Sequence, residues 1–310
     1  MQVIEQPVLR RPILLLAFSG WVDGGQVGTS AVRYLIDRWG AKKFAELDPD
    51  SFYNFTRVRP QVQIEPDFTR TITWPETAFY YHVAPVLERD FVLLLGIEPN
   101  YRWRTFSAEV QRVCEAVGVS SALSLGGVIA EVPHTRPAQI RVFSSDPDLI
   151  ARFPELGARR GAYQGPTGII GVISDGLTKA GIPVGNMRGA VPHYIAGSAN
   201  PKVTHGLLAR LNTLYDLGLD LSDLAQASRR FERQVNRALA DRPEAADYVK
   251  KLEGRAGEAE PEGEPPVAQE EASSGSEELP SGDEIIRQFE EFLRERSSGQ
   301  EGDASDPHAT

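Results

Sequence analysis

The sequence predicts an α/β fold: a three-layer α/β/α sandwich in which helices cover both faces of a mostly parallel sheet. Two observations predict it. Residues 12–36, PILLLAFSGWVDGGQVGTSAVRYLI, begin as an apolar run, pass through a glycine-rich loop and end in an amphipathic helical pattern. Further short apolar runs then alternate with helical patterns along the chain. Of the 310 residues, 41% are hydrophobic and 25% charged, which is the composition of a globular protein with a sizeable core.

Five segments are predicted as strands of the sheet because they are short, apolar or β-branched, and bounded by turn residues. In chain order they are ILLLAF at 13–18, FVLLLGI at 91–97, SALSLGG at 121–127, IRVFSS at 140–145 and NMRGAVP at 186–192. Residues 44–83 are rich in β-branched and aromatic residues and are interrupted by prolines. This stretch is predicted to contribute additional strands.

Apolar residues at helical spacing predict helices between these strands. They fall at residues 103–117, 168–183, 203–214 and roughly 222–240. Cys114 belongs to the apolar side of the first, so we expect a core residue. Arg230, Arg233 and Arg237 share one face of the last. That face is either simply solvated or a docking place for the acidic tail.

The acidic charge of the chain is concentrated at its end. The net charge is −10, and residues 254–310, with 16 acidic and 4 basic residues, carry −12 of it, which leaves +2 on residues 1–253. We expect residues 1–253 to form the α/β domain with its C-terminal helices, and 254–280 to be a disordered acidic linker. Residues 298–310 are predicted to be a disordered tail.

Between the linker and the tail, residues 281–297 predict an amphipathic helix with one apolar face, made of Ile285, Ile286, Phe289, Phe292 and Leu293. A helix this short needs a surface to be stable. It either docks on its own body or binds a groove of another protein, and these residues are the candidate partner-binding helix.

Composition excludes several classes of function. The nearly neutral body gives no sign of a nucleic-acid surface. The longest apolar runs are shorter than the roughly 20 residues that a membrane span needs. Cys114 is the single cysteine, which suits a reducing compartment. We therefore expect a cytoplasmic protein without membrane or nucleic-acid partners.

Candidate ligand-binding residues follow the ends of the predicted strands, where open α/β sheets place their ligand crevice. Glycines there allow close backbone approach, helix N-termini offer N–H groups to anions, and acidic or histidine side chains supply acid–base groups. This candidate rim comprises Gly20, Asp23, Gly24, Gly25, Glu98, Gly126, Gly127, Thr167, Gly168 and His193.

Each feature of the rim also has a structural interpretation. The loop GWVDGGQVG matches neither the dinucleotide-binding nor the P-loop glycine pattern, and its glycines could serve a sharp turn and close packing. Asp23 and Thr167 could cap the helices that follow them. His134 and His193 could be hydrogen-bonded core histidines. No complete catalytic or metal-binding motif stands out, so we assign no catalytic residue, metal or cofactor.

Several ordered motifs resemble the proteasome assembly chaperone family, type two, in its actinobacterial branch. They are AFSGWVDGGQVGTSAVRYLI (17–36), LLLGIEPNYRW (93–103), LGGVIAEVPHTRP (125–137), QGPTGIIGVISDGLTKAGIP (164–183) and VPHYIAGSANPKVTHGLLARL (191–211). The resemblance implies a fold similar to nucleoside phosphorylases and related hydrolases, and a homo-oligomer, with a trimer as the first expectation.

The resemblance also implies a function, because the eukaryotic relatives are non-catalytic chaperones of proteasome α-ring assembly. The first hypothesis is therefore a non-catalytic assembly chaperone or protein-interaction protein with the proteasome or another protein as partner. The alternative is a small-molecule-binding protein or enzyme of the phosphorylase or hydrolase type, using the rim at the strand ends.

Overall fold

The computed structural model describes residues 1–152, 154, 157–240, 242–255 and 287. Apart from Gly254, Arg255 and Arg287, the predicted linker, amphipathic helix and tail lie outside the described residues, and so does the apolar face from Ile285 to Leu293. The last helix ends at Arg255, two residues beyond the expected end of the domain.

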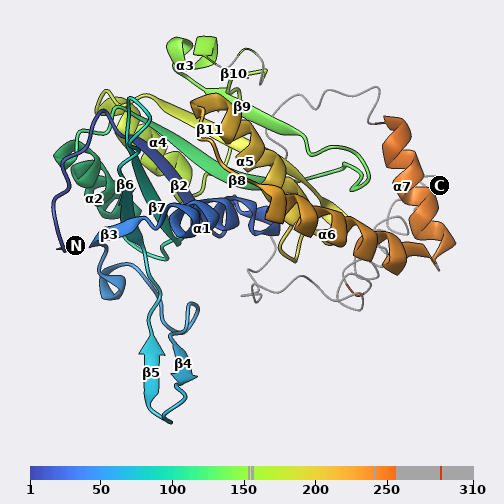
Figure 1. The fold of residues 1–310 in the computed structure, drawn as a ribbon, viewed down its shortest axis with the longest axis horizontal. Helices are drawn as coiled ribbons and strands as arrows, with labels where there is room; N and C mark the ends of the chain where they lie inside the picture. The colour runs from blue at the N-terminus through green and yellow to red at the C-terminus, as the bar shows by residue number, and fades with distance from the viewer. Residues whose placement is uncertain (153, 155–156, 241, 256–286, 288–310) are drawn as a thin grey trace, which may run out of the picture.

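A nine-stranded sheet lies at the centre of the molecule, in the order β1-β3-β6-β7-β2-β8-β11-β9-β10 (Figure 1). Its strands are β1 (Gln2–Val3), β2 (Ile13–Ser19), β3 (Lys42–Glu46), β6 (Ala78–His82), β7 (Phe91–Ile97), β8 (Ser121–Ala130), β9 (Ile140–Ser144), β10 (Arg159–Arg160) and β11 (Val184–Pro192). The four central strands β7, β2, β8 and β11 run parallel, whereas β1, β3, β6 and β9 pair antiparallel with their neighbours toward the centre. The sheet is thus mixed, with a parallel centre.

Helices cover both faces of this sheet, which confirms the α/β fold. They are α1 (Val27–Trp39), α2 (Trp103–Ala116), α3 (Pro147–Arg152), α4 (Ile169–Lys179), α5 (Pro201–Tyr215), α6 (Ser222–Ala240) and α7 (Pro243–Arg255), with 3₁₀ turns at η1 (Gly24–Gln26), η2 (Pro49–Ser51) and η4 (His193–Ile195). The four helices expected from spacing are present as α2, α4, α5 and α6. Helix α7 was not expected.

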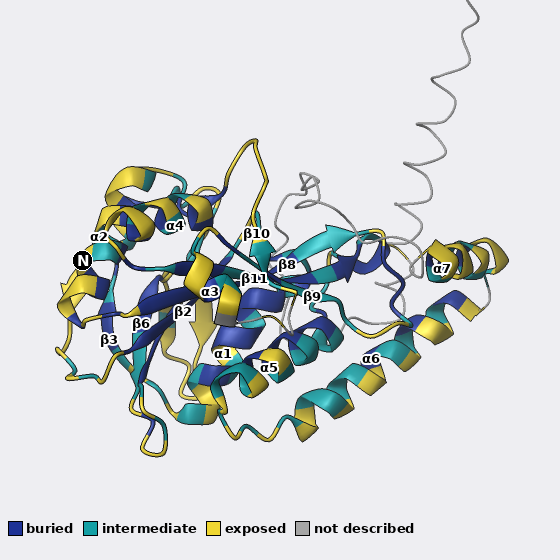
Figure 2. Cartoon of the chain, turned by 90° about the horizontal axis from the view of Figure 1, so that it is seen from above, coloured by how far each residue is buried: buried dark blue, intermediate teal, exposed yellow. Residues whose placement is uncertain are grey.

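The alternating side chains of β2 divide the interior into two cores. Leu14 and Leu16 pack with α2 and α4, whereas Ile13 and Leu15 pack with α1 and α5 on the opposite face. Figure 2 shows the buried strands between the two helical layers. Cys114 of α2 is completely buried in the first core, and this burial raises the pKa of its thiol to about 12. Its predicted core position is confirmed.

A third, smaller core closes the molecule beyond the end of β11. Helix α6 packs along α5, and α6 and α7 together close on η4 (Figure 1). The residues that fill this core are Tyr194, Ile195, Phe231, Val235, Leu239, Ala245, Val249 and Leu252. Helices α6 and α7 therefore cover part of the edge to which the parallel strands point.

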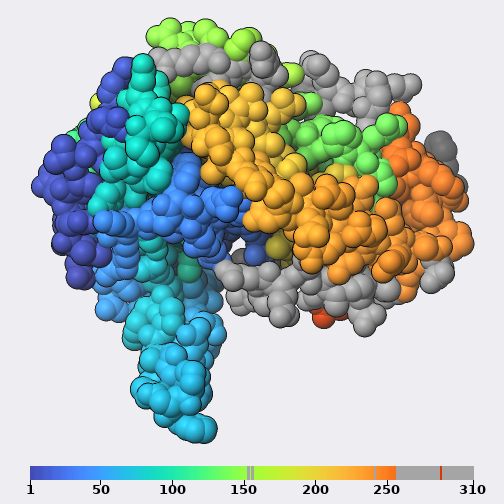
Figure 3. All heavy atoms as spheres, viewed as in Figure 1, coloured from blue at the N-terminus to red at the C-terminus, as the bar shows by residue number. Residues whose placement is uncertain are grey.

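A separate hairpin of β4 (Gln61–Ile64) and β5 (Arg70–Thr73) projects from the body (Figures 1 and 3). Val62 and Ile72 form a cross-strand pair, and Ile64, two residues after Val62, lies on the same face of the ribbon. These apolar side chains are exposed: Val62 by 49%, Ile64 by 62% and Ile72 by 50%. The strand-rich stretch 44–83 is thus confirmed, but only β3 and β6 join the central sheet.

Candidate functional site

The carboxyl ends of the central strands meet at one edge of the sheet, because β7, β2, β8 and β11 are parallel neighbours. Gly20 and Asp23 follow β2, Glu98 follows β7 and His193 follows β11. Gly126 and Gly127 do not follow their strand as expected but lie within β8, which continues to Ala130. The rim residues nevertheless divide into three groups: one around Glu98, one around Asp23, and one around His193.

Glu98, directly after β7, joins the N-terminus of α4 to the loop after β2. Its Oε1 accepts a hydrogen bond from the backbone N–H of Ile169 at 2.7 Å, and its Oε2 accepts one from the backbone N–H of Trp21 at 3.2 Å. Gly168 is the N-cap residue of α4 and forms no side-chain cap bond, so Glu98 supplies the acceptor from outside the helix. Thr167 is exposed and donates its hydroxyl hydrogen bond to Gly168 O instead of capping α4.

Asp23 binds the start of α1 with both carboxylate oxygens. Oδ1 accepts hydrogen bonds from the backbone N–H groups of Gly28 and Thr29 at 2.8 and 3.1 Å, and Oδ2 accepts one from the Thr29 hydroxyl at 2.5 Å. The side chain is buried, and burial raises the pKa of Asp23 to about 7 although the three donors act in the opposite direction. The capping interpretation of Asp23 matches this geometry.

The rim glycines let the loop after β2 lie against β8. A Cβ on Gly127 would meet the carbonyl oxygen of Gly24 at 2.0 Å, and one on Gly126 would meet that of Val22 at 2.4 Å. Gly25 adopts φ +60° beneath Asn200, where a larger residue would be strained. A Cβ on Gly20 would meet Glu98 Cβ at 2.8 Å. These close approaches fill the edge with protein atoms.

His193 lies apart from the two carboxylates, where β8 and β11 meet α7. Its Nδ1 donates to the carbonyl oxygen of Ala130 at 3.1 Å, since a carbonyl can only accept. Nε2 then accepts from the hydroxyl of Tyr248 in α7 at 3.0 Å. Asp23 and His193 thus bind different partners, the first at the start of α1 and the second at β8 and α7.

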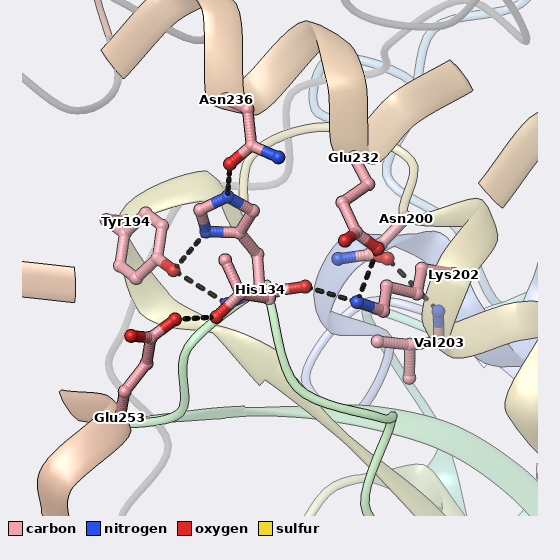
Figure 4. A network of polar contacts seen from close by, with 9 residues as sticks. His134, Tyr194, Asn200, Lys202, Val203, Glu232, Asn236 and Glu253 are labelled. Carbon is pink, nitrogen blue, oxygen red and sulfur yellow. Dashed lines mark hydrogen bonds and ion pairs between the residues drawn. The ribbon is translucent and has the colours of Figure 1, made fainter. Parts of the chain in front are cut away.

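A polar cluster around His134 attaches α6 and α7 to the same edge (Figure 4). His134 Nδ1 lies 2.7 Å from the Tyr194 hydroxyl, and its Nε2 lies 3.0 Å from Asn236 Oδ1 of α6. Lys202 donates to the carbonyl oxygen of His134 and forms an ion pair with Glu232 of α6 at 2.7 Å. Burial lowers the pKa of His134.

The sequence analysis identified both histidines but not their partners. Each partner is far along the chain from the histidine that it binds. Tyr194, Lys202 and Asn236 are 60, 68 and 102 positions from His134. Tyr248 is 55 positions from His193, and no spacing rule links these pairs. The one available signal was the VPHY segment, in which His193 precedes a large aromatic residue at a strand end.

The spaces at this edge are small. The depression beside Glu98, lined by Phe18, Trp21, Val22, Ile169 and Ile170, has no room for a water molecule. A cavity of about 20 Å³ near His134 and Lys202 holds about one water. Among the described residues no group of three or more His, Cys, Asp or Glu side chains could hold a metal ion. Within the same residues, no helix has both the length and the apolar character that a bilayer span requires.

The architecture therefore defines a three-layer α/β protein whose strand-end edge holds helix caps, close glycine contacts and part of the α6–α7 pair. Comparison with family models identifies the family of the chain, because the PAC2 family model matches residues 17–239. The chain belongs to the PAC2 family.

Solved structures agree with this assignment. The chain is 38% identical to a PAC2 family protein from Streptomyces avermitilis, with a TM-score of 0.68 over 77% of this chain and 99% of that one. It is 34% identical to a proteasome-assembly chaperone homologue from Mycobacterium tuberculosis, with a TM-score of 0.68 over 76% of this chain and 99% of that one. An archaeal proteasome activator from Pyrococcus furiosus shares the fold at 21% identity and a TM-score of 0.60, over 76% and 96% of the two chains. A search among curated proteins found no match.

Proposed function

We propose that this chain is an assembly chaperone or protein-interaction protein that acts on proteasome subunits and has no catalytic step of its own. The observation that carries the proposal is the 34% identity to the Mycobacterium tuberculosis protein, which is described as a proteasome-assembly chaperone homologue and is covered over 99% of its length. The chain thus resembles that relative over a whole domain.

The contacts at the strand-end edge support this choice over the small-molecule alternative. Glu98 and Asp23, the two carboxylates expected to do acid–base work, each bind backbone N–H groups at the start of a helix. Those bonds give both side chains a role in holding α4 and α1. The space beside Glu98 is closed even to water.

The projecting hairpin supplies a surface suited to a protein partner. Val62, Ile64 and Ile72 are exposed on one face, and the opposite face carries Gln63 and Thr71. Exposed apolar side chains gathered on one rigid element are typical of protein-binding sites, since scattered ones would not form a patch. We place the contact with proteasome α-subunits on this face.

The experiment is an assembly reaction with purified α- and β-subunits of the proteasome from the source organism. We expect the chain to bind free α-subunits stoichiometrically on native gels and to accelerate the appearance of half-proteasomes. An I64D/I72D variant should lose this binding, whereas a Q63D/T71D variant adds the same charge to the polar face and should retain it. If wild-type chain never binds α-subunits, the chaperone function is wrong.

We further propose a cytoplasmic homo-oligomer, with a trimer as the expected state, from the actinobacterial branch of the family. Two relatives above 30% identity come from Streptomyces and Mycobacterium, which supports the branch. Native mass spectrometry of the full chain measures the oligomer, and fractionation of the source cells measures the compartment. A monomer at micromolar concentration, or recovery with membranes, would contradict these two proposals.

A further inference from the structure

The outer face of α6 carries four arginines, and the one acidic residue near that face, Asp223 in the first turn, accepts a hydrogen bond from the Tyr34 hydroxyl. Phe231, Val235 and Leu239 are buried on the inner face. With 3.6 residues per turn, the side of the helix directly opposite holds the arginines, which are all exposed. We call this set the arginine stripe: Arg229, Arg230, Arg233 and Arg237. In Figure 3 the outer side of α6 lies at the surface, with no other described element in front of it.

The stripe lacks an anionic partner within the part of the chain that the structure describes. The one side-chain bond from it is donated by Arg230 to the amide oxygen of Gln226, and none of the four arginines has a carboxylate within ion-pair distance. Glu232, the nearest acidic residue in sequence, is bound to Lys202 on the inner side.

The stripe also disfavours its own helix. Arg229 and Arg233, and again Arg233 and Arg237, are like charges four residues apart, a spacing that destabilises a helix. An ordinary solvated face mixes both signs of charge, so an all-arginine face is costly unless an anion covers it. Arginine is also the cation best suited to carboxylates, because its planar fork binds both oxygens at once.

The same chain contains an acidic segment soon after α7. From Glu258 to Glu271 its sequence is EAEPEGEPPVAQEE, which has six glutamates and no basic residue. Glutamates occupy every second position from Glu258 to Glu264, and prolines at 261, 265 and 266 favour extended backbone in the residues before them.

We propose that the acidic segment Glu258–Glu271 binds the arginine stripe of α6 in the same molecule. The spacings agree: arginines four residues apart on a helix repeat every 6 Å or so, and alternate residues of an extended chain repeat every ~6.6 Å. Two glutamates at alternate positions, such as Glu262 and Glu264, can therefore meet two successive arginines of the stripe.

The attachment point makes this contact efficient. Helix α7 packs against α6 and ends at Arg255, three residues before Glu258. The inner side of α6 is shared with α7, so the segment must pass around a helix about 10–12 Å wide to reach the stripe. Helix α7 is 13 residues long and spans about 20 Å, so at ~3.3 Å per extended residue six or more residues after Arg255 lie on the path, and the glutamates that reach the stripe are those from Glu262 onward. Such a short tether gives a local concentration of about millimolar, which lets individually weak ion pairs act together.

Cleavage of the full-length chain by a glutamate-specific protease tests the proposal, because the segment offers six cleavage positions. At low salt, cleavage between 258 and 271 should be about tenfold slower in wild type than in an R229Q/R233Q/R237Q variant, the extent that a few cooperating ion pairs provide. The control variant R57Q/R59Q/R70Q removes the same number of exposed charges from the hairpin region and should behave as wild type. At 1 M NaCl the protection should disappear, since salt screens such pairs.

A free peptide of residues 256–275 corrects for the effect of salt on the protease itself. Equal cleavage rates in wild type and the stripe variant at low salt would overturn the proposal. A second measurement uses the R233K variant, whose amine a carboxylate–amine coupling reagent can join to a nearby glutamate. The sample is a mixture of ¹⁴N-labelled and ¹⁵N-labelled chains, so that products within one chain are distinguished from products between chains. We expect products that join the substituted position to glutamates 258–271 within one chain; products that join heavy and light chains in statistical proportion would overturn the intramolecular contact.

Discussion

Glu98 Oε1 accepts a hydrogen bond from the backbone N–H of Ile169, the first residue of α4, although the two residues are 71 positions apart. An N-cap side chain usually accepts from the second or third N–H group of a helix, but the N-cap residue Gly168 has no side chain to supply an acceptor. The structure therefore stabilises the start of α4 from a neighbouring strand, and the same carboxylate holds the loop after β2 through Trp21.

Replacing Glu98 by alanine should lower the free energy of unfolding by about 1–2 kcal/mol, the usual cost of losing a helix cap. Urea denaturation monitored by circular dichroism measures it. The E98Q variant keeps an acceptor for Ile169 but loses the charge, so its loss should be smaller. An E98A variant as stable as wild type would show that the contact has no energetic importance.

Asp23 should make the protein less stable as pH rises. Its pKa is about 7 in the folded chain against 3.8 as the reference, so its contribution is fully present below pH ~4 and is lost as pH rises through 7. Between pH 5 and 8 the wild type should lose about 3 kcal/mol relative to D23N, which stays neutral and keeps an oxygen for Gly28 and Thr29. Parallel stability curves for the two proteins across this range would contradict the prediction.

His134 should act in the opposite direction. Its pKa is lowered by burial, so the stability it contributes is present above its ordinary value of 6.5 and is lost as pH falls through the lowered value. Lys202 lowers this pKa further, whereas Asn236, Glu232 and Glu253 raise it. Acidification from pH 7.5 to 5 should therefore loosen α6, which His134 holds through Asn236.

Hydrogen exchange of α6, corrected for the intrinsic pH dependence, measures this loosening. The pKa values of His82 and His205 are also lowered, so the informative quantity is the difference between wild type and H134Q. Exchange in α6 should rise on acidification of the wild type by more than in H134Q. The same rise in both proteins would assign the effect to other groups.

The hydrophobic pattern predicted the main layers because each strand and helix carries its own periodicity. Alternation along β2 places Leu14 and Leu15 on opposite faces, and both faces are covered by helices, as expected. The mixed character of the sheet was harder to foresee. β9 was expected among the strands, but its antiparallel direction beside β11 depends on the path of the chain between them.

At the strand-end edge, the sequence indicated which residues lie there but not which groups they bind. Glu98 and Asp23 were selected as acid–base candidates because they follow strands, and they do follow them. The backbone N–H groups that donate to these carboxylates come close only in the folded chain, as that of Ile169 does to Glu98. His134, in the loop after β8, and Asn236 of α6 are 102 positions apart. Tyr248, which binds His193, belongs to α7, a helix that the sequence analysis did not predict.

The close contact between β8 and the loop after β2 gives the last prediction. A Cβ at position 127 would lie 2.0 Å from the carbonyl oxygen of Gly24, and both partners are backbone, so neither can rotate away. G127A should therefore cost about 2 kcal/mol or more, because the loop or β8 must shift. G254A adds the same methyl group where nothing lies within 4 Å and, because alanine favours the helix α7, should leave stability unchanged or raise it by up to about 1 kcal/mol. Thermal unfolding of the two variants beside wild type measures both effects. If G127A unfolds at the wild-type temperature, the loop after β2 can move away from β8 at little cost. The strand-end edge could then open enough to admit a ligand.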